Sequence, residues 1–488
     1  MNAGRRTRAS GPVSRSGQPT GQMPAKKKWP LLIVANRLPV VRGKAKGEGT
    51  WKRSPGGLVS ALTPIVQRAG GAWAGWTGTT GPAPDPFEYD GITHLPVPIS
   101  RAQLGSFYDG FCNGTIWPLY HSAIREPEYH RRWWRPYVTV NRKFAEITAE
   151  SAGPDATVWV HDYHLQLAPA MLREMRPDLR IGFFLHIPFP PEELFGRLPW
   201  RRQILEGLLG ADVVGFQTEG DADNFLRGAR RYADARIDGG PVQIHGHTLS
   251  VEAFPVSTDF DHYSSMASHP KVVKRSVQLH HQVGQGRKII LGVDRLDYTK
   301  GIDVRLRAFH ELLSRRPEAV RECVLVQLAV PSRGRVAEYR QLRSQVEELV
   351  GQINGEYGEV GLTPVQYMHR ELPFEELIAL YRSAEVMIVT PLADGMNLVA
   401  KEYVATRFDN SGVLILSEFA GAAQELRSAL QVNPHDVDGL AETIDMALSL
   451  PEKEAVRRMS RMRDVLSEHT VYDWADSFMA SLSSHAAG

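Results

Sequence analysis

Short runs of apolar, often β-branched residues alternate with amphipathic segments from Trp29 onward. In the first half of the chain such runs predict buried strands over residues 31–35, 157–160, 181–187 and 213–217, and residues 165–175 have a helical pattern. Continuous apolar strands separated by helices are typical of a parallel sheet that is covered on both faces. We therefore expect a doubly wound α/β domain over residues 29–258.

A second series of the same kind follows a polar stretch rich in His, Ser and Lys. We expect a linker region in that stretch, over residues 259–287. After it, the pattern predicts strands over residues 288–293, 324–330, 365–368, 386–390 and 412–416. We expect a second doubly wound domain over residues 288–465, and a C-terminal helix in residues 466–488 that packs back toward the first domain.

The clearest helical pattern of the second half lies between its first two strands. Ile302, Leu306, Phe309 and Leu313 are separated by four, three and four positions. This spacing places all four apolar side chains on one face and predicts a helix over residues 302–315.

The net charge of +2 hides an asymmetry between the N-terminal tail and the rest of the chain. Residues 1–29 hold seven basic side chains and no acidic one, which leaves 50 basic and 55 acidic side chains in residues 30–488. Because the first 28 residues also lack the apolar content that folding requires, we expect a disordered basic tail over residues 1–28. The mildly acidic body argues against a nucleic-acid partner, although a local basic pocket for a small phosphorylated ligand is compatible with it.

Apolar runs and cysteines narrow the class further. No apolar run approaches the ~18–20 residues that span a bilayer, so we expect no membrane partner. The two cysteines, Cys112 and Cys323, lie far apart in unrelated contexts, which argues against a disulfide framework or a cysteine-based metal site. A cytoplasmic two-domain enzyme is the class that these features favour.

Two facing doubly wound domains place the carboxyl ends of both sheets around one crevice, where open α/β sheets bind their ligands. Neither half carries a good dinucleotide-binding fingerprint there. Gly284 and Gly286 precede the predicted strand 288–293 instead of following it, and no Walker A sequence occurs. A nicotinamide or flavin oxidoreductase is therefore disfavoured, and we expect no cofactor.

In the first half, polar residues follow the predicted strands directly. Arg37 comes just after the strand 31–35, and the loop that follows ends in Gly56 and Gly57 at the start of an amphipathic helix. Glycines at a helix N-terminus let backbone N–H groups approach an anion, but the same two glycines would also serve a simple turn. The residues alone leave both interpretations open.

A carboxylate and several imidazoles cluster at the ends of the next two strands. Asp162 lies between His161 and His164, and the strand 181–187 contains His186 near its end. These side chains are suited to holding sugar hydroxyls or moving protons, and the alternative is a plain hydrogen-bonding group at a strand end. A metal site formed by His161 and His164 is disfavoured, because no Cys or Glu cluster supports it.

Asp221 and Asp223 match the Asp-x-Asp pattern with which some nucleotide-sugar enzymes hold a divalent ion. Here the two carboxylates precede an apolar periodic segment, where they suit the first turn of a helix. We favour that capping role and expect no metal.

The second half holds the stronger anion signal. Arg295 and Lys300 lie in the loop after the strand 288–293, next to the start of the predicted helix 302–315, and together they can neutralise a diphosphate. Asp294 and Asp297 lie in the same loop and could neutralise the two cations instead.

Two later loops add to this picture. Arg333 follows the strand 324–330 and supplies a third cation. After the strand 386–390, Gly395 permits close backbone approach and a helix that starts near Asn397 aims free N–H groups at a ligand. Asp394 and Glu402 can each accept hydroxyl hydrogen bonds from a sugar or a ribose. The motifs together fit a nucleotide-sugar donor that faces an acceptor.

Together these motifs resemble the trehalose-6-phosphate synthase family. The match runs in order from about residue 30 to residue 480. The matching blocks are Asn36-Arg37-Leu38-Pro39, Gly56-Gly57-Leu58, Trp117-Pro118, His161-Asp162-Tyr163-His164-Leu165, Phe184-Leu185-His186-Ile187-Pro188-Phe189-Pro190, Arg295-Leu296-Asp297-Tyr298-Thr299-Lys300-Gly301, Ser332-Arg333-Gly334 and Asp394-Gly395-Met396-Asn397-Leu398-Val399-Ala400-Lys401-Glu402-Tyr403.

The resemblance implies a GT-B fold, in which two Rossmann-like domains face each other across the active site. It also implies an activity, the transfer of glucose from a nucleoside diphosphate glucose to glucose 6-phosphate. The product would be α,α-trehalose 6-phosphate, formed with retention at the donor anomeric carbon. The substrates expected as partners are these two small molecules, and we also expect a homo-oligomer.

The same resemblance implies roles for individual residues. The acceptor site would consist of Arg37, Tyr108, Trp117, Asp162 and Arg333, with Asp162 holding hydroxyls and the others holding the phosphate. The donor site would consist of Gly57, His186, Arg295, Lys300, Asp394, Gly395, Met396, Asn397, Leu398 and Glu402. Of these residues, His186, Arg295, Lys300 and Asp162 are the ones we expect to act in catalysis.

Two departures from the family pattern accompany the match. Ser257-Thr258 stands where relatives often have Gly, near the expected interdomain connection, and Ala393 stands where many have Arg beside the donor loop. The sequence leaves open whether the donor carries uridine, adenosine or guanosine. Two alternatives are a related synthase with another acceptor and a non-catalytic sugar-phosphate sensor on the same scaffold.

Overall fold

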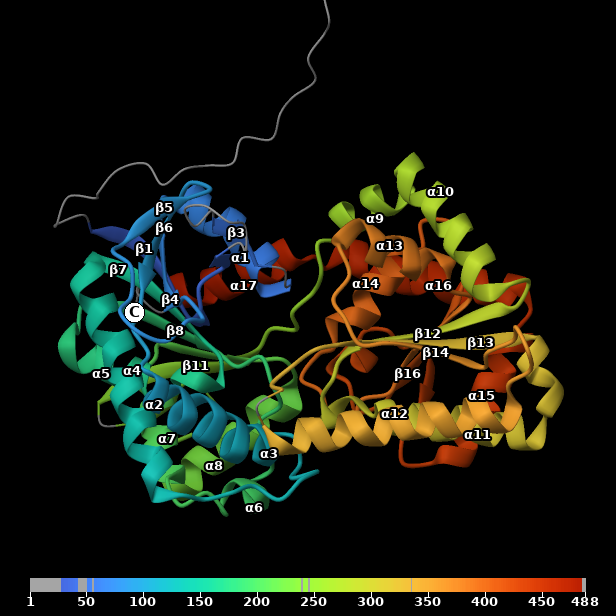
Figure 1. Cartoon of the computed structure of the whole chain (residues 1–488). Helices are drawn as coiled ribbons and strands as arrows, with labels where there is room; N and C mark the ends of the chain where they lie inside the picture. Colours follow the sequence, from blue (N-terminus) through green and yellow to red (C-terminus); the bar gives the residue numbers. More distant parts are fainter. Residues whose placement is uncertain are drawn as a thin grey trace, which may run out of the picture.

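The computed structural model describes residues 28–42, 51–54, 57–237, 240–244, 246–334 and 336–484. These residues form two α/β halves, each with its own largely parallel sheet between layers of helices (Figure 1). The basic tail expected over residues 1–28 lies outside the described residues, apart from Lys28. No helix in the described ranges has both the length and the apolar character that crossing a membrane requires.

The N-terminal half is built on nine strands in the order β10-β11-β9-β8-β7-β1-β4-β6-β5. Neighbours are parallel except for the edge pairs β10–β11 and β5–β6. All four strands predicted here are present, although β8 ends at Phe184, three residues before the predicted end. The strands are β1 (Trp29–Arg37), β4 (Ala72–Trp76), β5 (Phe87–Tyr89), β6 (Ile92–Pro96), β7 (Ala152–His161), β8 (Arg180–Phe184), β9 (Val213–Phe216), β10 (Val242–Ile244) and β11 (His247–Ala253).

Both faces of this sheet are covered, as continuous apolar strands require. Leu31 and Ile33 of β1 pack with α1 and the C-terminal helix α17 (Val471–Ser484), whereas Leu32 and Val34 pack with the layer that contains α4. A short antiparallel hairpin, β2 (Val40–Arg42) and β3 (Trp51–Arg53), stands beside the sheet. The helices are α1 (Gly57–Ala69), α2 (Arg101–Gln103), the π-helix η1 (Leu104–Ile116), α3 (Trp117–Tyr120), α4 (Arg131–Ser151), η2 (Tyr163–Leu165), α5 (Ala168–Met175), α6 (Glu192–Phe195), α7 (Arg201–Leu208) and α8 (Glu219–Tyr232).

The C-terminal half has a six-stranded sheet, parallel throughout, in the order β14-β13-β12-β15-β16-β17. The five strands predicted for this half are present, and the helix predicted over residues 302–315 is α11 with those same bounds. The strands are β12 (Lys288–Arg295), β13 (Cys323–Val330), β14 (Val365–Met368), β15 (Val386–Val389), β16 (Val413–Ser417) and β17 (Leu430–Val432).

Helices cover this sheet from both sides (Figure 1). One layer contains α11 (Ile302–Arg315), α12 (Ala337–Tyr357) and α15 (Val437–Ser449). The other contains α9 (Phe260–Ser268), α10 (Pro270–Leu279), α13 (Phe374–Ser383), α14 (Leu398–Thr406) and α16 (Glu452–Glu468). Short helical turns η3 (His280–Gly284), η4 (Tyr298–Lys300), η5 (Pro317–Arg321) and η6 (Gly421–Gln424) complete the half.

The stretch expected to be a linker, residues 259–287, is instead mostly helical. It forms α9, α10 and η3, and α9 and α10 pack against α13 and α14 of the C-terminal half. Ala267, Val272 and Leu279 are buried in that contact, so the polar composition of the stretch belongs to its exposed faces. The connection between the two halves is therefore short.

The chain crosses between the halves twice. It passes from β11 to α9 through residues 254–259, and it returns between α16 and α17. Figure 1 shows α17 lying against the N-terminal half, beside α1. In that position Trp474 of α17 packs on Trp159 of β7 and Phe184 of β8, with ring centroids 5.1 Å apart in both pairs. The helix α17 thus packs on the sheet of the N-terminal half, on the same face as α1.

Candidate active site

Asp162 and His186 lie where β7 and β8 end. The N–H of Asp162 donates to the carbonyl of Phe184 (2.8 Å), and its Oδ1 accepts from the N–H of His186 (3.3 Å). Asp162 has φ of +76°, a left-handed conformation that is uncommon for a residue other than glycine. The backbone of two adjacent strand ends therefore fixes this carboxylate in place.

Burial shifts the pKa values of Asp162 and His186. It raises the pKa of Asp162 to about 6, although hydrogen bonds from the Tyr163 and His186 backbone and the charges of Arg295 and Arg333 oppose the rise. Burial also lowers the pKa of His186 to about 3, so this imidazole is neutral near pH 7. His186 consequently acts as a hydrogen-bonding group and not as a cation.

The imidazoles next to Asp162 have partners other than a metal. Nδ1 of His161 lies 3.1 Å from Nε2 of His186, and the ring of His164 stacks on Tyr108 with centroids 5.7 Å apart. Within the described ranges, no group of three His, Cys, Asp or Glu side chains could hold a metal ion. Asp221 lies in the first turn of α8 as expected, but Thr218 caps the helix: its hydroxyl accepts from the N–H of Asp221 (3.2 Å), while Oδ1 of Asp221 accepts from the N–H of Phe189 (2.8 Å).

Arg333 reaches from the C-terminal half onto the N-terminal half. Its guanidinium lies 3.8 Å from the ring centroid of Trp117, and Nη2 donates to the hydroxyl of Tyr163 (3.1 Å). On its own side, Nη1 pairs with Oδ2 of Asp297 (3.1 Å) and bonds the hydroxyl of Tyr339. Arg333 is thus held from both halves at once.

Asp297 is the counter-ion that keeps Arg333 in place. Burial alone raises the pKa of this carboxyl, but the charges of Arg333, Lys300 and Arg295 outweigh the effect and the pKa falls to about 2. Its other oxygen accepts from the N–H of Thr299 (3.1 Å), which fixes the carboxylate within its loop. The sequence placed Asp297 beside Arg295 and Lys300, whereas the structure assigns it to Arg333.

Arg37 and Tyr108 extend the same surface on the N-terminal side. Arg37 lies over the ring of Trp76 at 4.9 Å, and Tyr108 lies 6.2 Å from that ring. Gly78 makes room for the arginine, because a Cβ at this position would fall 2.3 Å from Nη2 of Arg37. The sequence analysis missed Gly78, since nothing local marks a glycine that accommodates a side chain 41 positions away.

A set of contacts connects all members of the predicted acceptor site. Three arginines act on buried His164, whose pKa is lowered first by burial and then by the charges of Arg333, Arg295 and Arg37. The structure thus brings cations from both halves around one point beside Asp162.

Arg295 and Lys300 differ in how they are balanced. The Lys300 ammonium lies 2.5 Å from Oδ2 of Asp394, and both side chains are largely buried. Arg295 is exposed and lies 5.8 Å from the ring of Trp117, and within the described part of the chain it forms no ion pair. Asp294 pairs with the buried Arg305 (2.7 Å) and Asp297 with Arg333, so neither aspartate of this loop forms a direct ion pair with Arg295 or Lys300.

The loop after β15 brings the C-terminal half against His186. Asn397 caps α14: its Oδ1 accepts from the N–H of Ala400 (3.3 Å) while its Nδ2 donates to Asp394 (3.0 Å). Asn397 itself has φ of +73°, and α14 begins at Leu398. Met396 is buried beneath the loop. The predicted donor residues 394–398 therefore form one rigid turn at a helix N-terminus.

Gly395 lies at a close contact between the halves. A Cβ at this position would lie 2.5 Å from the carbonyl oxygen of His186. We therefore expect Gly395→Ala to push the donor loop away from the N-terminal half and to lower kcat/KM at least tenfold, while the fold persists. Steady-state kinetics together with the melting temperature test this expectation, and Gly355→Ala, on open surface of α12, is the matched control. Unchanged kinetics in Gly395→Ala would contradict the close contact.

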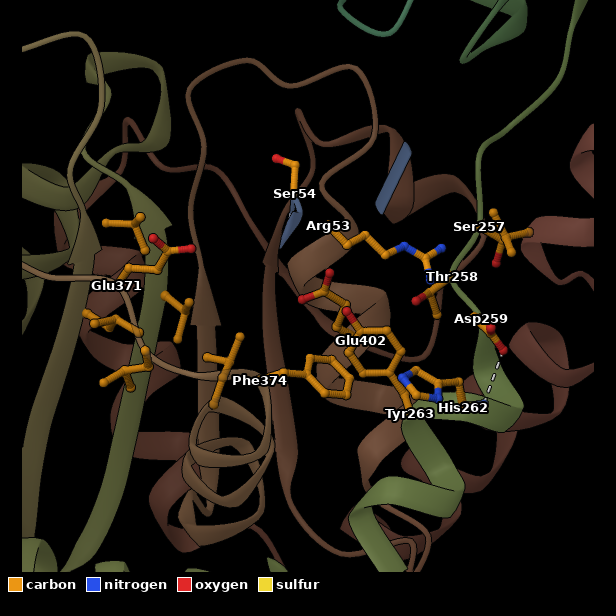
Figure 2. A pocket seen from close by; sticks show the side chains of 16 residues that line it. Arg53, Ser54, Ser257, Thr258, Asp259, His262, Tyr263, Glu371, Phe374 and Glu402 are labelled. Atoms are coloured by element: carbon orange, nitrogen blue, oxygen red, sulfur yellow. Dashed lines mark hydrogen bonds between the residues drawn. The ribbon is translucent and has the colours of Figure 1, made fainter. Parts of the chain in front are cut away.

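Glu402, in the middle of α14, lines a cavity of 470 Å³. Figure 2 shows its carboxylate beside the ring of Tyr263, with Phe374 and His262 next to it. Oε2 of Glu402 accepts from the hydroxyl of Tyr381 (2.9 Å), and burial raises the pKa of this carboxyl. The size and mixed lining of the cavity suit a ligand as large as a nucleoside.

The sequence analysis did not find the aromatic wall of this cavity. His262 and Tyr263 belong to α9, inside the expected linker, and the ring of His262 stacks on Phe374 with centroids 5.1 Å apart. Arg53, the last residue of β3, and Ser54, which follows it, line the cavity from the N-terminal half. Gly57 begins α1 close behind them along the chain, and the intervening Pro55 and Gly56 lie outside the described residues.

Comparison with known proteins decides what kind of enzyme this site belongs to. The model of the family described as "Glycosyltransferase family 20" matches residues 30–484. The chain belongs to glycosyltransferase family 20. The resemblance predicted from the motifs is thereby confirmed, and the protein is a glycosyltransferase.

Members of family 20 with high similarity share nearly the whole chain. A trehalose-6-phosphate synthase of Mycobacterium avium (strain 104) is 52% identical over 466 residues, covering 93% of this chain and 95% of the relative. A UDP-forming α,α-trehalose-phosphate synthase from Burkholderia xenovorans, solved in complex with glucose-6-phosphate, superposes with a TM-score of 0.85 at 37% identity, covering 93% of this chain and 99% of that one.

A further solved structure carries UDP-2-fluoro glucose. It is a trehalose-6-phosphate protein from E. coli bound with UDP-2-fluoro glucose, with a TM-score of 0.85, 35% identity, and coverage of 93% of this chain and 98% of that one. With likeness at this level over both halves, the architecture of the chain is the GT-B fold that was expected.

Proposed function

We propose that this family 20 glycosyltransferase transfers glucose from a nucleoside diphosphate glucose to glucose 6-phosphate and releases α,α-trehalose 6-phosphate and the nucleoside diphosphate. The observation that carries the proposal is the meeting of arginines from both halves beside Asp162 and its neighbour His164. Arg333 and Arg295 lie over Trp117, and Arg37 lies over Trp76 next to Tyr108, whose ring stacks on His164. Such a cluster of cations suits a phosphate dianion, and the adjacent carboxylate suits the hydroxyls of the same sugar.

The acceptor would bind on the surface shared by the two halves. Arg37, Tyr108, Trp117 and Arg333 would hold its phosphate, and Asp162 would accept hydrogen bonds from its hydroxyls. Because Arg333 comes from the C-terminal half, acceptor binding would draw the halves together. Closure would also exclude the water that could otherwise hydrolyse the donor.

The donor would bind mainly to the C-terminal half. Arg295, Lys300 and the backbone near Gly57 would hold the diphosphate, and Glu402 would hold the ribose in the 470 Å³ cavity. The transferred glucose would lie against His186 and residues 394–398. Two similar solved structures are bound with UDP-2-fluoro glucose and with glucose-6-phosphate, which supports a nucleotide-sugar donor and a sugar-phosphate acceptor for this chain.

The transfer would proceed with retention by front-face substitution. The bond from the anomeric carbon to the phosphate oxygen breaks while the acceptor hydroxyl forms its bond on the same face, and the hydroxyl proton passes to the departing phosphate. Arg295 and Lys300 would stabilise the negative charge that develops on this phosphate. Asp394, the carboxylate of the donor loop, is held by Lys300 and Asn397.

A product assay tests the proposal. The enzyme is incubated with glucose 6-phosphate in three parallel reactions, with UDP-glucose, ADP-glucose or GDP-glucose as the donor. The product is analysed by NMR for two α-configured anomeric carbons joined by one glycosidic bond. We expect trehalose 6-phosphate from at least one donor, with UDP-glucose preferred, and none when glucose 6-phosphate is omitted. Turnover only with a different acceptor would overturn the proposed acceptor, and nucleotide binding without turnover would indicate a sensor.

The pH dependence of acceptor use follows from Asp162. The pKa of this carboxyl is raised to about 6, so it is ionised above that value, and below it the neutral carboxyl is a weaker acceptor of hydroxyl hydrogen bonds. The acceptor phosphate also titrates near pH ~6. We therefore expect log kcat/KM for glucose 6-phosphate to fall below pH 6 with a slope that approaches two in the wild type. In Asp162→Asn the slope should be one, and equal slopes in both proteins would rule out the role of Asp162.

Assembly as a homo-oligomer and a cytoplasmic location stay predictions. Size-exclusion chromatography with light scattering tests the first, and cell fractionation tests the second.

A further inference from the structure

The two chain crossings between the halves are fastened to each other. The N–H of Val471, at the start of α17, donates to the carbonyl of Thr258 in the first crossing (3.1 Å). The hydroxyl of Tyr472 donates to Oδ2 of Asp259 (2.8 Å). Any change in the angle between the halves must therefore bend at this one joint.

A buried ion pair in the C-terminal half holds both crossings. Lys401 of α14 is fully buried, and its Nζ lies 2.5 Å from Oε2 of Glu425 and donates to the carbonyl of Val256 in the first crossing (2.8 Å). Oε1 of Glu425 lies 3.1 Å from Nδ1 of His469 in the second crossing. Lys401 thus fastens one crossing, and Glu425 fastens the other.

The N-terminal half holds the first crossing from the opposite side. Oε1 of Gln217, just after β9, accepts from the N–H of Val256 (3.0 Å), and Nε2 of the same side chain donates to the carbonyl of His186 (3.4 Å). That carbonyl is the group that Gly395 of the donor loop closely approaches. A continuous set of contacts therefore joins the hinge to the place where the halves meet in the active site.

The chemistry of the Lys401–Glu425 ion pair indicates that it fixes the arrangement of its partners and does not serve mainly to stabilise the fold. Taking an ammonium and a carboxylate out of water is unfavourable, and apolar side chains of similar volume would often stabilise a fold as well or better. An ion pair with further hydrogen bonds, however, admits only one arrangement of its partners. Lys401 directly precedes Glu402 on α14, and Asn397 caps the start of the same helix. Fixing Lys401 to Val256 therefore fixes the donor-binding helix relative to the N-terminal half.

We propose that Lys401 and Glu425 are positioning residues that form a hinge anchor: they set the angle between the halves, and through it the approach of Arg333 to Trp117 and of the donor loop to His186. The anchor acts on the acceptor site, which needs both halves, and on the cavity beside Glu402, because residues of the first crossing (257–259) and Val471 of the second line that cavity. Its kinetic readout rests on the function proposed above, whereas its structural readout does not.

A double variant tests the kinetic consequence. Lys401→Met/Glu425→Gln removes the ion pair without leaving a lone buried charge. We expect the KM for glucose 6-phosphate to rise about tenfold in this variant, because Arg333 no longer meets Trp117 at the native angle between the halves. The matched control is Arg275→Met/Glu376→Gln, which removes a 2.6 Å ion pair between α10 and α13, within the C-terminal half. Equal increases in the acceptor KM for both double variants would contradict the anchor.

Double electron–electron resonance between two spin labels tests the angle between the halves directly, without substrate. Spin labels at Glu88→Cys and Val360→Cys, both exposed and one in each half, report the separation of the halves, and the native Cys112 and Cys323 are buried. We expect one narrow distance distribution in the wild type and a clearly broader or shifted one in the double variant. An unchanged distribution in the folded double variant would overturn the proposal, even if the enzyme showed no synthase activity.

Gln217→Met provides a second variant should the double variant fail to fold. It breaks the same connection from the N-terminal side and leaves Lys401 and Glu425 paired. We expect a broader distance distribution and a higher acceptor KM here as well. A wild-type distribution in Gln217→Met would count against the anchor.

Discussion

Replacing Arg295 or Lys300 with alanine is expected to lower kcat about 100-fold or more. Each cation would face the diphosphate at the moment when its bond to glucose breaks, and a preorganised charge at such a position is worth on the order of 2–4 kcal/mol in the transition state. Arg295 gives the cleaner result, because within the described part of the chain it forms no ion pair whose loss would add a second effect.

Single-turnover kinetics with saturating substrates measure this effect on the chemical step. Arg295→Lys is expected to recover part of the rate, since it keeps the charge and loses the two-pronged hydrogen bond. Arg321→Ala, an exposed arginine that pairs with Glu359 on the surface of the C-terminal half, is the control and should behave as the wild type. Near-wild-type rates for both Arg295→Ala and Lys300→Ala would refute the leaving-group role.

Lys300→Ala needs a further control because of Asp394. Burial would raise the pKa of this carboxyl, but Lys300 outweighs the effect and holds the pKa below its usual range. Without the ammonium, a buried carboxylate is left unpaired, which disturbs the donor loop as well as the diphosphate site. Lys300→Met/Asp394→Asn separates the two effects, because it leaves no unpaired charge and still lacks the cation.

The positions of these polar residues in the fold were predictable from the sequence because they lie at strand ends. Asp162, Arg295 and Asp394 each follow an apolar run that is a strand in the structure, and the carboxyl ends of parallel strands necessarily meet at one edge of a sheet. The helix α11 was equally predictable, since its apolar face repeats over 14 residues without interruption. Local periodicity was sufficient wherever the elements themselves are local.

What the sequence could not predict depends on contacts between distant segments. The helices α9 and α10 bury few side chains in a polar stretch, so their apolar faces become visible only once α13 and α14 are in place. Asp297 lies two positions from Arg295, and its pairing with Arg333 depends on the register between β12 and β13. Pairing across a sheet is decided by the fold and not by proximity along the chain.

The ion pairs across the sheet also explain how a slightly acidic protein holds a local group of cations. The folded body is slightly acidic, yet Arg37, Arg295 and Arg333 gather around one point. Asp297 pairs with Arg333 and Asp394 pairs with Lys300, so carboxylates of the protein itself hold Arg333 and Lys300 in place. A phosphorylated ligand then meets charges that are already oriented, which lowers the cost of ordering them on binding.

Arg333→Met is expected to lower kcat/KM for glucose 6-phosphate about 100-fold. The variant loses a charge-assisted contact to the phosphate, worth about 1.5–3 kcal/mol per hydrogen bond, together with the contact to Trp117 that joins the halves. Unphosphorylated glucose, supplied at high concentration, is the discriminating substrate, because its slow use should change little. The ratio of the two kcat/KM values therefore isolates the phosphate contribution.

Stability must be separated from binding in this variant, because Arg333 also balances the fully buried Asp297. The pKa of Asp297 is depressed to about 2, so the wild-type pair stabilises the fold above the usual aspartate range near pH ~4 and loses that contribution as the pH falls toward 2. Arg333→Met alone leaves a buried carboxylate without a partner, which costs about 3–5 kcal/mol. Arg333→Met/Asp297→Asn removes that charge and should recover most of the stability in urea at pH 7, but none of the lost kcat/KM. Recovery of both would mean that Arg333 supports the fold and does not bind the acceptor phosphate.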